Sequence, residues 1–185
     1  MFLKITRRLS DDKAFTLIEV IVSLVLAGII ATVAGLGLVQ VSQGYIFAKQ
    51  NAETTQKIQV AMNRIVKELA AAQPQTSTST AITAGGTTSV SYTRPASIGS
   101  ATFVTNTISI SGTLVQMSGN TGGTILNNAV ANSLSFAYFD TNGTLLPAPV
   151  ASLAKIRRID ITLSVTGADN LASQFTNSVW INESY

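Results

Sequence analysis

An uninterrupted apolar segment near the start of the chain is its most distinctive pattern. Residues 20–39 contain no charged side chain, and they follow directly after the carboxylate of Glu19. An α-helix rises about 1.5 Å per residue, so a segment of this length spans the roughly 30 Å hydrocarbon core of a bilayer. The pattern therefore predicts a transmembrane helix with one carboxylate at its start.

The helix is predicted to continue past the apolar segment. Residues 40–73 lack proline and are rich in Gln, Ala, Lys and Glu, and Pro74 is expected to end the element. Apolar residues recur there at helical spacing in two sets that do not share one register, which indicates a bend or a change of facing between them. The sets are Val41, Tyr45, Ala48 and Ala52, then Ile58, Met62, Ile65 and Leu69.

The remainder of the chain has the pattern of β-strands. Residues 74–95 are rich in Ser and Thr and are expected to form a surface loop that leads into the first strand, and from Thr88 onward apolar residues alternate with polar ones. Short turn sequences favour one antiparallel sheet, whose apolar face the stripe Ile58–Leu69 would cover. The predicted fold class is α+β, a long N-terminal helix packed by its distal half on an antiparallel β-sheet head. Further strands are expected within 103–111, 113–117, 133–139, 155–165 and 175–181.

Composition argues against an enzyme. The chain has no His and no Cys, which removes imidazole bases, thiol nucleophiles, disulfides and most zinc sites. The acidic residues of the head show no paired-carboxylate spacing. Asp140, Asn142 and Gly143 resemble part of a calcium loop but lack a distal acidic ligand, so they indicate a capped turn. We therefore expect no catalytic residues, no metal and no cofactor.

The basic residues also favour a membrane over a nucleic acid as partner. The segment 1–14 carries more Lys and Arg than Asp, which places it in the cytoplasm by the positive-inside rule. The predicted strand residues Arg157 and Arg158 are adjacent and so face opposite sides, which does not make a binding groove. The basic residues of the distal helix indicate a solvated face or subunit contacts and no DNA-binding stripe. These are Lys49, Lys57, Arg64 and Lys67.

The sequence Ala14-Phe-Thr-Leu-Ile-Glu19, between a basic leader and an apolar helix, resembles the class III signal of type IV pilins and type II secretion pseudopilins. The resemblance implies that a prepilin peptidase cuts between Ala14 and Phe15 and methylates the new amine of Phe15. The family usually has Gly where this chain has Ala14. It also implies that Glu19 meets the N-terminus of a neighbouring subunit during assembly. The alternatives are that Glu19 reaches the membrane interface or pairs within its own chain, and that a conventional secretory cut follows the apolar segment.

The head is most similar to J-type minor pseudopilins and related minor pilins. The similarity rests on residues 124–130, 134–140 and 156–165, while the end of the chain lacks the basic residue often found there. The resemblance implies four regions. They are a leader (1–14), a transmembrane or filament-core half-helix (15–39), a distal half-helix (40–73) and an extracytoplasmic β-rich head (74–185).

The expected function is that of a minor pilin or pseudopilin near the tip of a type IV pilus or type II secretion pseudopilus. Its partners would be the prepilin peptidase, other pilin or pseudopilin subunits and the membrane. It would cross the inner membrane once, with the N-terminus inside and the head outside. The alternatives are a major pilin of the same filament class and a signal-anchored binding protein outside any filament, in which Glu19 would be dispensable.

Overall fold

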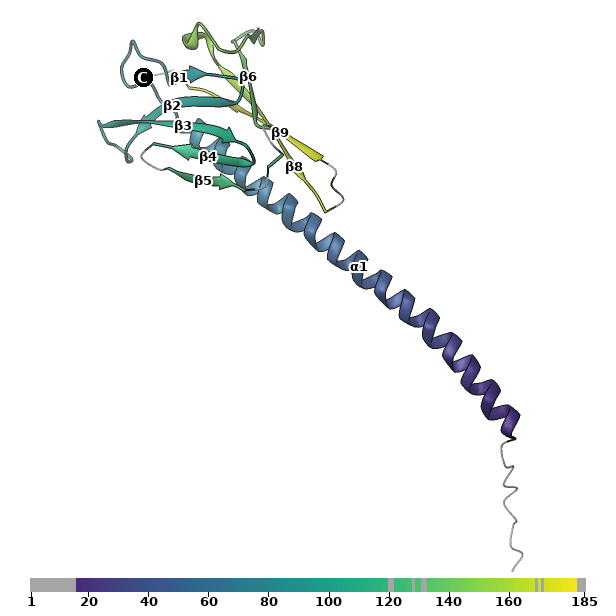
Figure 1. Ribbon diagram of the computed structural model, residues 1–185. Coiled ribbons are helices and arrows are strands. Elements are labelled where there is room, and N and C mark those ends of the chain that lie inside the picture. Colours follow the sequence, from purple (N-terminus) through teal and green to yellow (C-terminus); the bar gives the residue numbers. More distant parts are fainter. Residues whose placement is uncertain are drawn as a thin grey trace, which may run out of the picture. The chain divides into compact units, whose positions relative to one another are not determined.

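The computed structural model describes residues 16–119, 122–127, 129–130, 133–168, 170 and 172–182. The chain divides into two compact units, Met1–Ile46 and Phe47–Tyr185. The first contains the proximal part of one long helix. The second contains the distal part of that helix and two β-sheets (Figure 1).

Helix α1 extends over Leu17–Ala70, so it continues beyond the apolar segment as predicted. It has no proline to interrupt its hydrogen bonds, an acidic residue in its first turn and Lys67 in its last, which both complement the helix dipole. The helix ends three residues before the predicted limit. The chain leaves it through hydrogen bonds from Ala72 N to Leu69 O and from Gln73 N to Thr93 O, on a neighbouring strand.

Two antiparallel sheets form the head, where the sequence predicted one. Strands β1 to β5 make a five-stranded sheet in sequence order, and the second sheet has the order β7-β6-β8-β9. The first sheet comprises β1 (Ile82–Gly85), β2 (Ser89–Pro95), β3 (Phe103–Ser111), β4 (Leu114–Ser118) and β5 (Gly123–Leu126). The second comprises β6 (Ser135–Phe139), β7 (Leu145–Leu146), β8 (Arg158–Thr166) and β9 (Ala172–Trp180).

Three local predictions were wrong. The segment expected to be a loop contains β1, and β5 was not anticipated, whereas β2 coincides with the alternation expected from Thr88 onward. Lys155 lies in a 3-10 turn, Leu153–Lys155, instead of in a strand. Strands β1 and β5 have four residues each, which is too short for a clear alternation, and their pairing with longer neighbours stabilises them.

One hydrophobic core joins the distal helix to both sheets. Ile58, Met62, Ile65 and Leu69 are buried on one face of α1, as their spacing predicted. Residues from both sheets share the same cluster. Val90, Tyr92 and Ile108 come from the first sheet, and Phe136, Tyr138, Ile159, Ile161, Leu163 and Val179 from the second. The other predicted stripe, Val41 to Ala52, is exposed, and Phe175 is only partly buried.

Hydrogen bonds between the sheets fix one against the other. Phe136 N donates to Thr87 O at 2.8 Å, and Val150 N donates to Gly85 O at 2.9 Å. The buried Tyr138 hydroxyl donates to Gly86 O at 2.8 Å. These bonds satisfy the buried polar groups that they join at the sheet junction.

Candidate functional site

Thr16 accepts the first hydrogen bonds of helix α1. Its backbone oxygen accepts hydrogen bonds from Glu19 N at 3.0 Å and Val20 N at 3.2 Å, and its side-chain Oγ1 accepts a longer one from Glu19 N at 3.4 Å. Thr16 is therefore the N-cap, and Glu19 occupies the third helical position. Sequence reasoning missed this cap, although Thr-x-x-Glu ahead of an apolar segment is a recognised helix-start signal.

Glu19 is exposed in the first turn of α1. A carboxylate there is stabilised by the positive end of the helix dipole, by about 0.3–1 kcal/mol. Within the described part of the chain, no salt bridge involves Glu19. Its carboxylate is thus positioned by the helix without an ion-pair partner among those residues. The predicted cleavage and methylation site, Ala14 and Phe15, lies outside the described residues.

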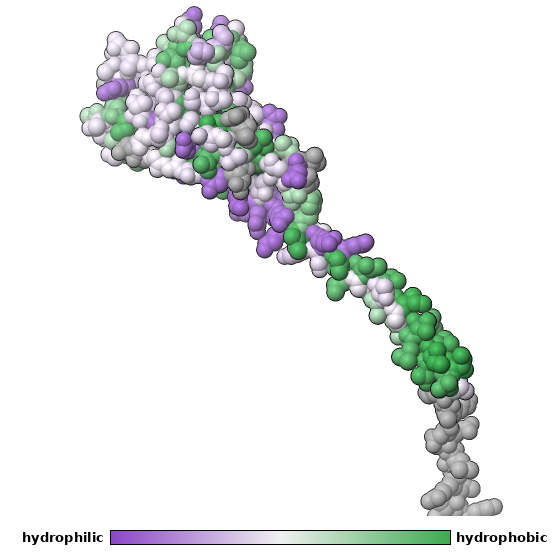
Figure 2. All heavy atoms as spheres, in the orientation of Figure 1, coloured by the Kyte–Doolittle hydropathy of each residue, from purple (hydrophilic) through white to green (hydrophobic). Residues whose placement is uncertain are grey.

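An exposed apolar surface follows Glu19. Every residue from Thr16 to Gln50 is exposed, and the large apolar side chains of this stretch gather along the proximal helix (Figure 2). The helix is long and apolar enough to cross a membrane. The two hydroxyl groups of residues 20–39 bond to the helix backbone, since Ser23 Oγ donates to Glu19 O and Thr32 Oγ1 donates to Gly28 O. A helix with such internal bonds exposes few unpaired donors to lipid.

Residues 9–35 match the family of the prokaryotic N-terminal methylation motif. The chain carries a class III signal. This signal is the one found on type IV pilins and pseudopilins, which are structural filament subunits. It implies processing by prepilin peptidase, anchoring in the inner membrane through the apolar helix, and assembly with other pilins. A comparison with curated proteins found no match.

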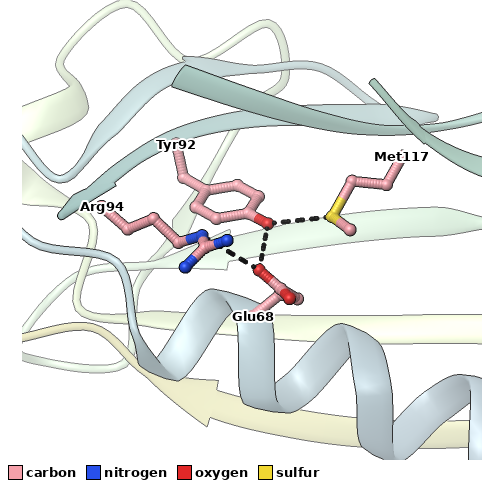
Figure 3. A network of polar contacts seen from close by, with 4 residues as sticks. All are labelled: Glu68, Tyr92, Arg94 and Met117. Carbon is pink, nitrogen blue, oxygen red and sulfur yellow. Dashed lines mark hydrogen bonds and ion pairs between the residues drawn. The ribbon is translucent and has the colours of Figure 1, made fainter. Parts of the chain in front are cut away.

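The pilin-like head contains a polar cluster that sequence reasoning missed (Figure 3). The Tyr92 hydroxyl on β2 donates to Glu68 Oε2 on α1 at 2.9 Å and lies 3.3 Å from Met117 Sδ on β4. Arg94 Nε, also on β2, lies 3.4 Å from the same carboxylate oxygen. Burial raises the pKa of the Tyr92 phenol, and the neighbouring Glu68 charge raises it further. The only hint in the sequence is that Glu68 adjoins the buried Leu69.

This cluster connects the distal helix to the five-stranded sheet. Tyr92 is fully buried, while the side chains of Glu68 and Arg94 keep about a fifth of their surface exposed. The cluster contains one carboxylate, one cation and one neutral hydroxyl. It lacks the paired acids or activated nucleophile of a catalytic site, so its hydrogen bonds have a structural role. Its chemistry is to hold α1 in one register on β2.

The remaining candidates in the pilin-like head have structural roles. Asp140 Oδ1 accepts hydrogen bonds from Asn142 N at 2.9 Å and Thr144 N at 2.8 Å, and Gly143 has a φ of 76°, so the predicted capped turn is confirmed. Among the described residues, no group of three or more acidic side chains could hold a metal ion.

The two adjacent arginines have separate partners. Arg157 Nη1 donates to two backbone carbonyls, those of Ala154 and Ile156. Arg158 pairs with Asp160, with Nε 3.0 Å from Oδ1, and its guanidinium lies 4.1 Å from the centre of the Phe139 ring. They do not combine into one cationic surface.

Proposed function

We propose that this chain is a minor subunit at or near the tip of a type IV pilus or type II secretion pseudopilus. The observation that carries the proposal is the class III signal, followed by a helix whose proximal apolar surface is exposed along its whole length. Such a surface needs a lipid or protein environment, because water solvates it poorly. The assignment to a minor, J-type subunit is supported by the resemblance of the head segments.

We assign to Glu19 the role of pairing with the N-terminus of a neighbouring subunit during assembly. Cleavage between Ala14 and Phe15 would create a cationic amine four residues ahead of this carboxylate, and N-methylation of Phe15 would leave that charge in place. Both charges would lie at the apolar helix start, where solvation is poor and pairing across subunits is favoured. Among the described residues no salt bridge involves the Glu19 carboxylate, so it is available for an external partner.

Processing is tested by intact mass and N-terminal sequencing of the full chain from membranes, with and without the prepilin peptidase. We expect a mature chain that begins at methylated Phe15 and is lost when the peptidase is absent. A chain cut after the apolar segment would contradict the proposal and leave a secreted domain. A chain that still begins at Met1 with the peptidase present would leave an anchored protein.

Assembly is tested by comparing Glu19→Gln with Glu53→Gln. Glu53 lies on the same helix and forms an exposed pair with Lys49, so its substitution is a matched loss of one carboxylate. We expect both variants to be processed, but only Glu53→Gln to be recovered in sheared filaments at the level of the unmodified chain. Equal recovery of both variants in filaments would refute the role of Glu19, whereas absence of the unmodified chain from filaments would favour a signal-anchored protein. Quantitative mass spectrometry of the filaments separates a minor from a major subunit.

A further inference from the structure

Strand β9 forms one open edge of the four-stranded sheet. It pairs with β8 through nine consecutive residue pairs without a register shift. Seven of its nine residues are exposed. The sequence of Ala172–Trp180 contains no charged residue, no proline and no glycine. A long, regular and uncharged edge of this kind presents unpaired backbone groups to another strand.

The other three sheet edges differ from β9. Strands β1 and β5 have four residues each, and both have a register shift where they meet their neighbours. Strand β7 has only two residues. Short strands and bulges are the usual means by which proteins prevent edge pairing. Short or bulged strands therefore hinder pairing at three of the four sheet edges, whereas β9 is long and regular.

The register determines which β9 amides point outward. Ile181 N donates to Arg157 O at 2.8 Å, which continues the β8–β9 register by one pair. Backbone groups alternate between the two sides of a strand, so the odd-numbered residues of β9 face β8 and the even-numbered ones face away. One outward amide, Ser178 N, is capped by the exposed side chain of Asn177 at 2.8 Å. A surface side chain of this kind gives way readily to a pairing strand.

We propose that β9 pairs antiparallel with β9 of a second copy of this chain, centred on Thr176. This register places Thr176 opposite itself, Gln174 opposite Ser178, and Ala172 opposite Trp180. All five are even-numbered, so every one of these pairs can form the new ladder. The two edges carry no like charges, and the exposed Trp180 ring, 67% accessible, faces the smallest side chain of the strand. A self-complementary edge of this kind is how two-fold dimers form.

Cysteine crosslinking tests the register, because the chain has no cysteine of its own. The full chain is produced in membranes with single substitutions and treated with a short bismaleimide. We expect Thr176→Cys to give a crosslinked dimer by itself. Gln174→Cys and Ser178→Cys should each fail alone but crosslink when the two variants are produced together. This pattern separates β9 pairing from association of the apolar helices, which has no such register.

Two controls keep the proposal open to refutation. Ser173→Cys, whose two copies would lie about 20 Å apart in this register, and Gln116→Cys, exposed on β4, should give no dimer. Adding Thr176→Lys to the mixed pair should lower its crosslinked fraction several-fold, since like charges would then meet at the centre. The proposal is overturned if neither Thr176→Cys nor the mixed pair crosslinks, if Ser173→Cys crosslinks as well as Thr176→Cys, or if the crosslinked product contains a different protein.

Discussion

Replacing Glu68 with Ala is the sharpest test of how the distal helix is held on the head. The substitution removes the acceptor of the Tyr92 hydroxyl bond and the partner of Arg94. A hydrogen bond to a charged group contributes about 1.5–3 kcal/mol, and a partly exposed ion pair adds at most about 1 kcal/mol. Met117 Sδ, at 3.3 Å, remains as a weak acceptor for the hydroxyl. We therefore expect a loss of about 2–3 kcal/mol in the free energy of unfolding.

Two companion variants sharpen the prediction. Glu68→Gln keeps an oxygen that accepts from Tyr92 but loses the charge, so we expect a loss of only about 1 kcal/mol. Glu53→Ala removes a carboxylate from the same helix, but its pair with Lys49 is 4.0 Å long and mostly exposed. The expected cost there is below about 0.5 kcal/mol. The difference between Glu68→Ala and Glu53→Ala therefore isolates the buried cluster.

The assay is thermal unfolding of the full chain in detergent, followed by circular dichroism and by the fluorescence of Trp180, the single tryptophan. At about 3 °C per kcal/mol for a chain of this size, Glu68→Ala should lower Tm by about 6–9 °C and Glu68→Gln by about 3 °C. The double variant Glu68→Ala/Tyr92→Phe should lose less than the sum of its parts, because both changes break one bond. Strict additivity, or a Glu68→Ala shift no larger than that of Glu53→Ala, would refute the reasoning.

Two further predictions concern the head. Burial raises the pKa of both Tyr92 and Tyr138, so the native state keeps two protons that the unfolded chain releases above about pH 10. The free energy of unfolding should therefore fall as pH rises from about 9 to 11. The accompanying fall in the urea midpoint should be smaller when both residues are replaced by Phe. Gly119→Ala should lower the free energy of unfolding by about 2 kcal/mol or more, because φ is 120° and a Cβ would lie 2.6 Å from Thr105 O. Gly112→Ala should lower it by only about 1 kcal/mol in the same urea titration, because φ is 59° and a Cβ there would meet open space.

Much of the helix and of the signal could be predicted because the relevant information is local. Ala14 to Glu19 form a contiguous motif, and the stripe Ile58–Leu69 has helical spacing that places its members on one face whatever they contact. The alternation around Tyr138 and Ile161 likewise identified buried strand faces. The N-cap at Thr16 could also have been predicted, because its spacing to Glu19 is visible in the sequence.

The division of the strands into two sheets could not be predicted, because it depends on which edges meet after the chain has folded. Strands β1 and β5 exist through pairing with β2 and β4, and their own four-residue sequences are too short to specify it. Likewise, the polar cluster joins Glu68 on the helix to Tyr92 and Arg94 on β2, more than twenty residues later in the chain. Only packing brings their polar atoms together.

The sequence by itself determined the long apolar helix, the class III signal before it and the α+β class, because these follow from apolar length, charge position and periodicity along the chain. Only the tertiary structure decided which carboxylate of the distal helix becomes buried against β2 and which strand remains an open edge. Burial and edge position are properties of neighbours in space. The uncharged composition of β9 has meaning for assembly only once that strand is known to lie at the edge of its sheet.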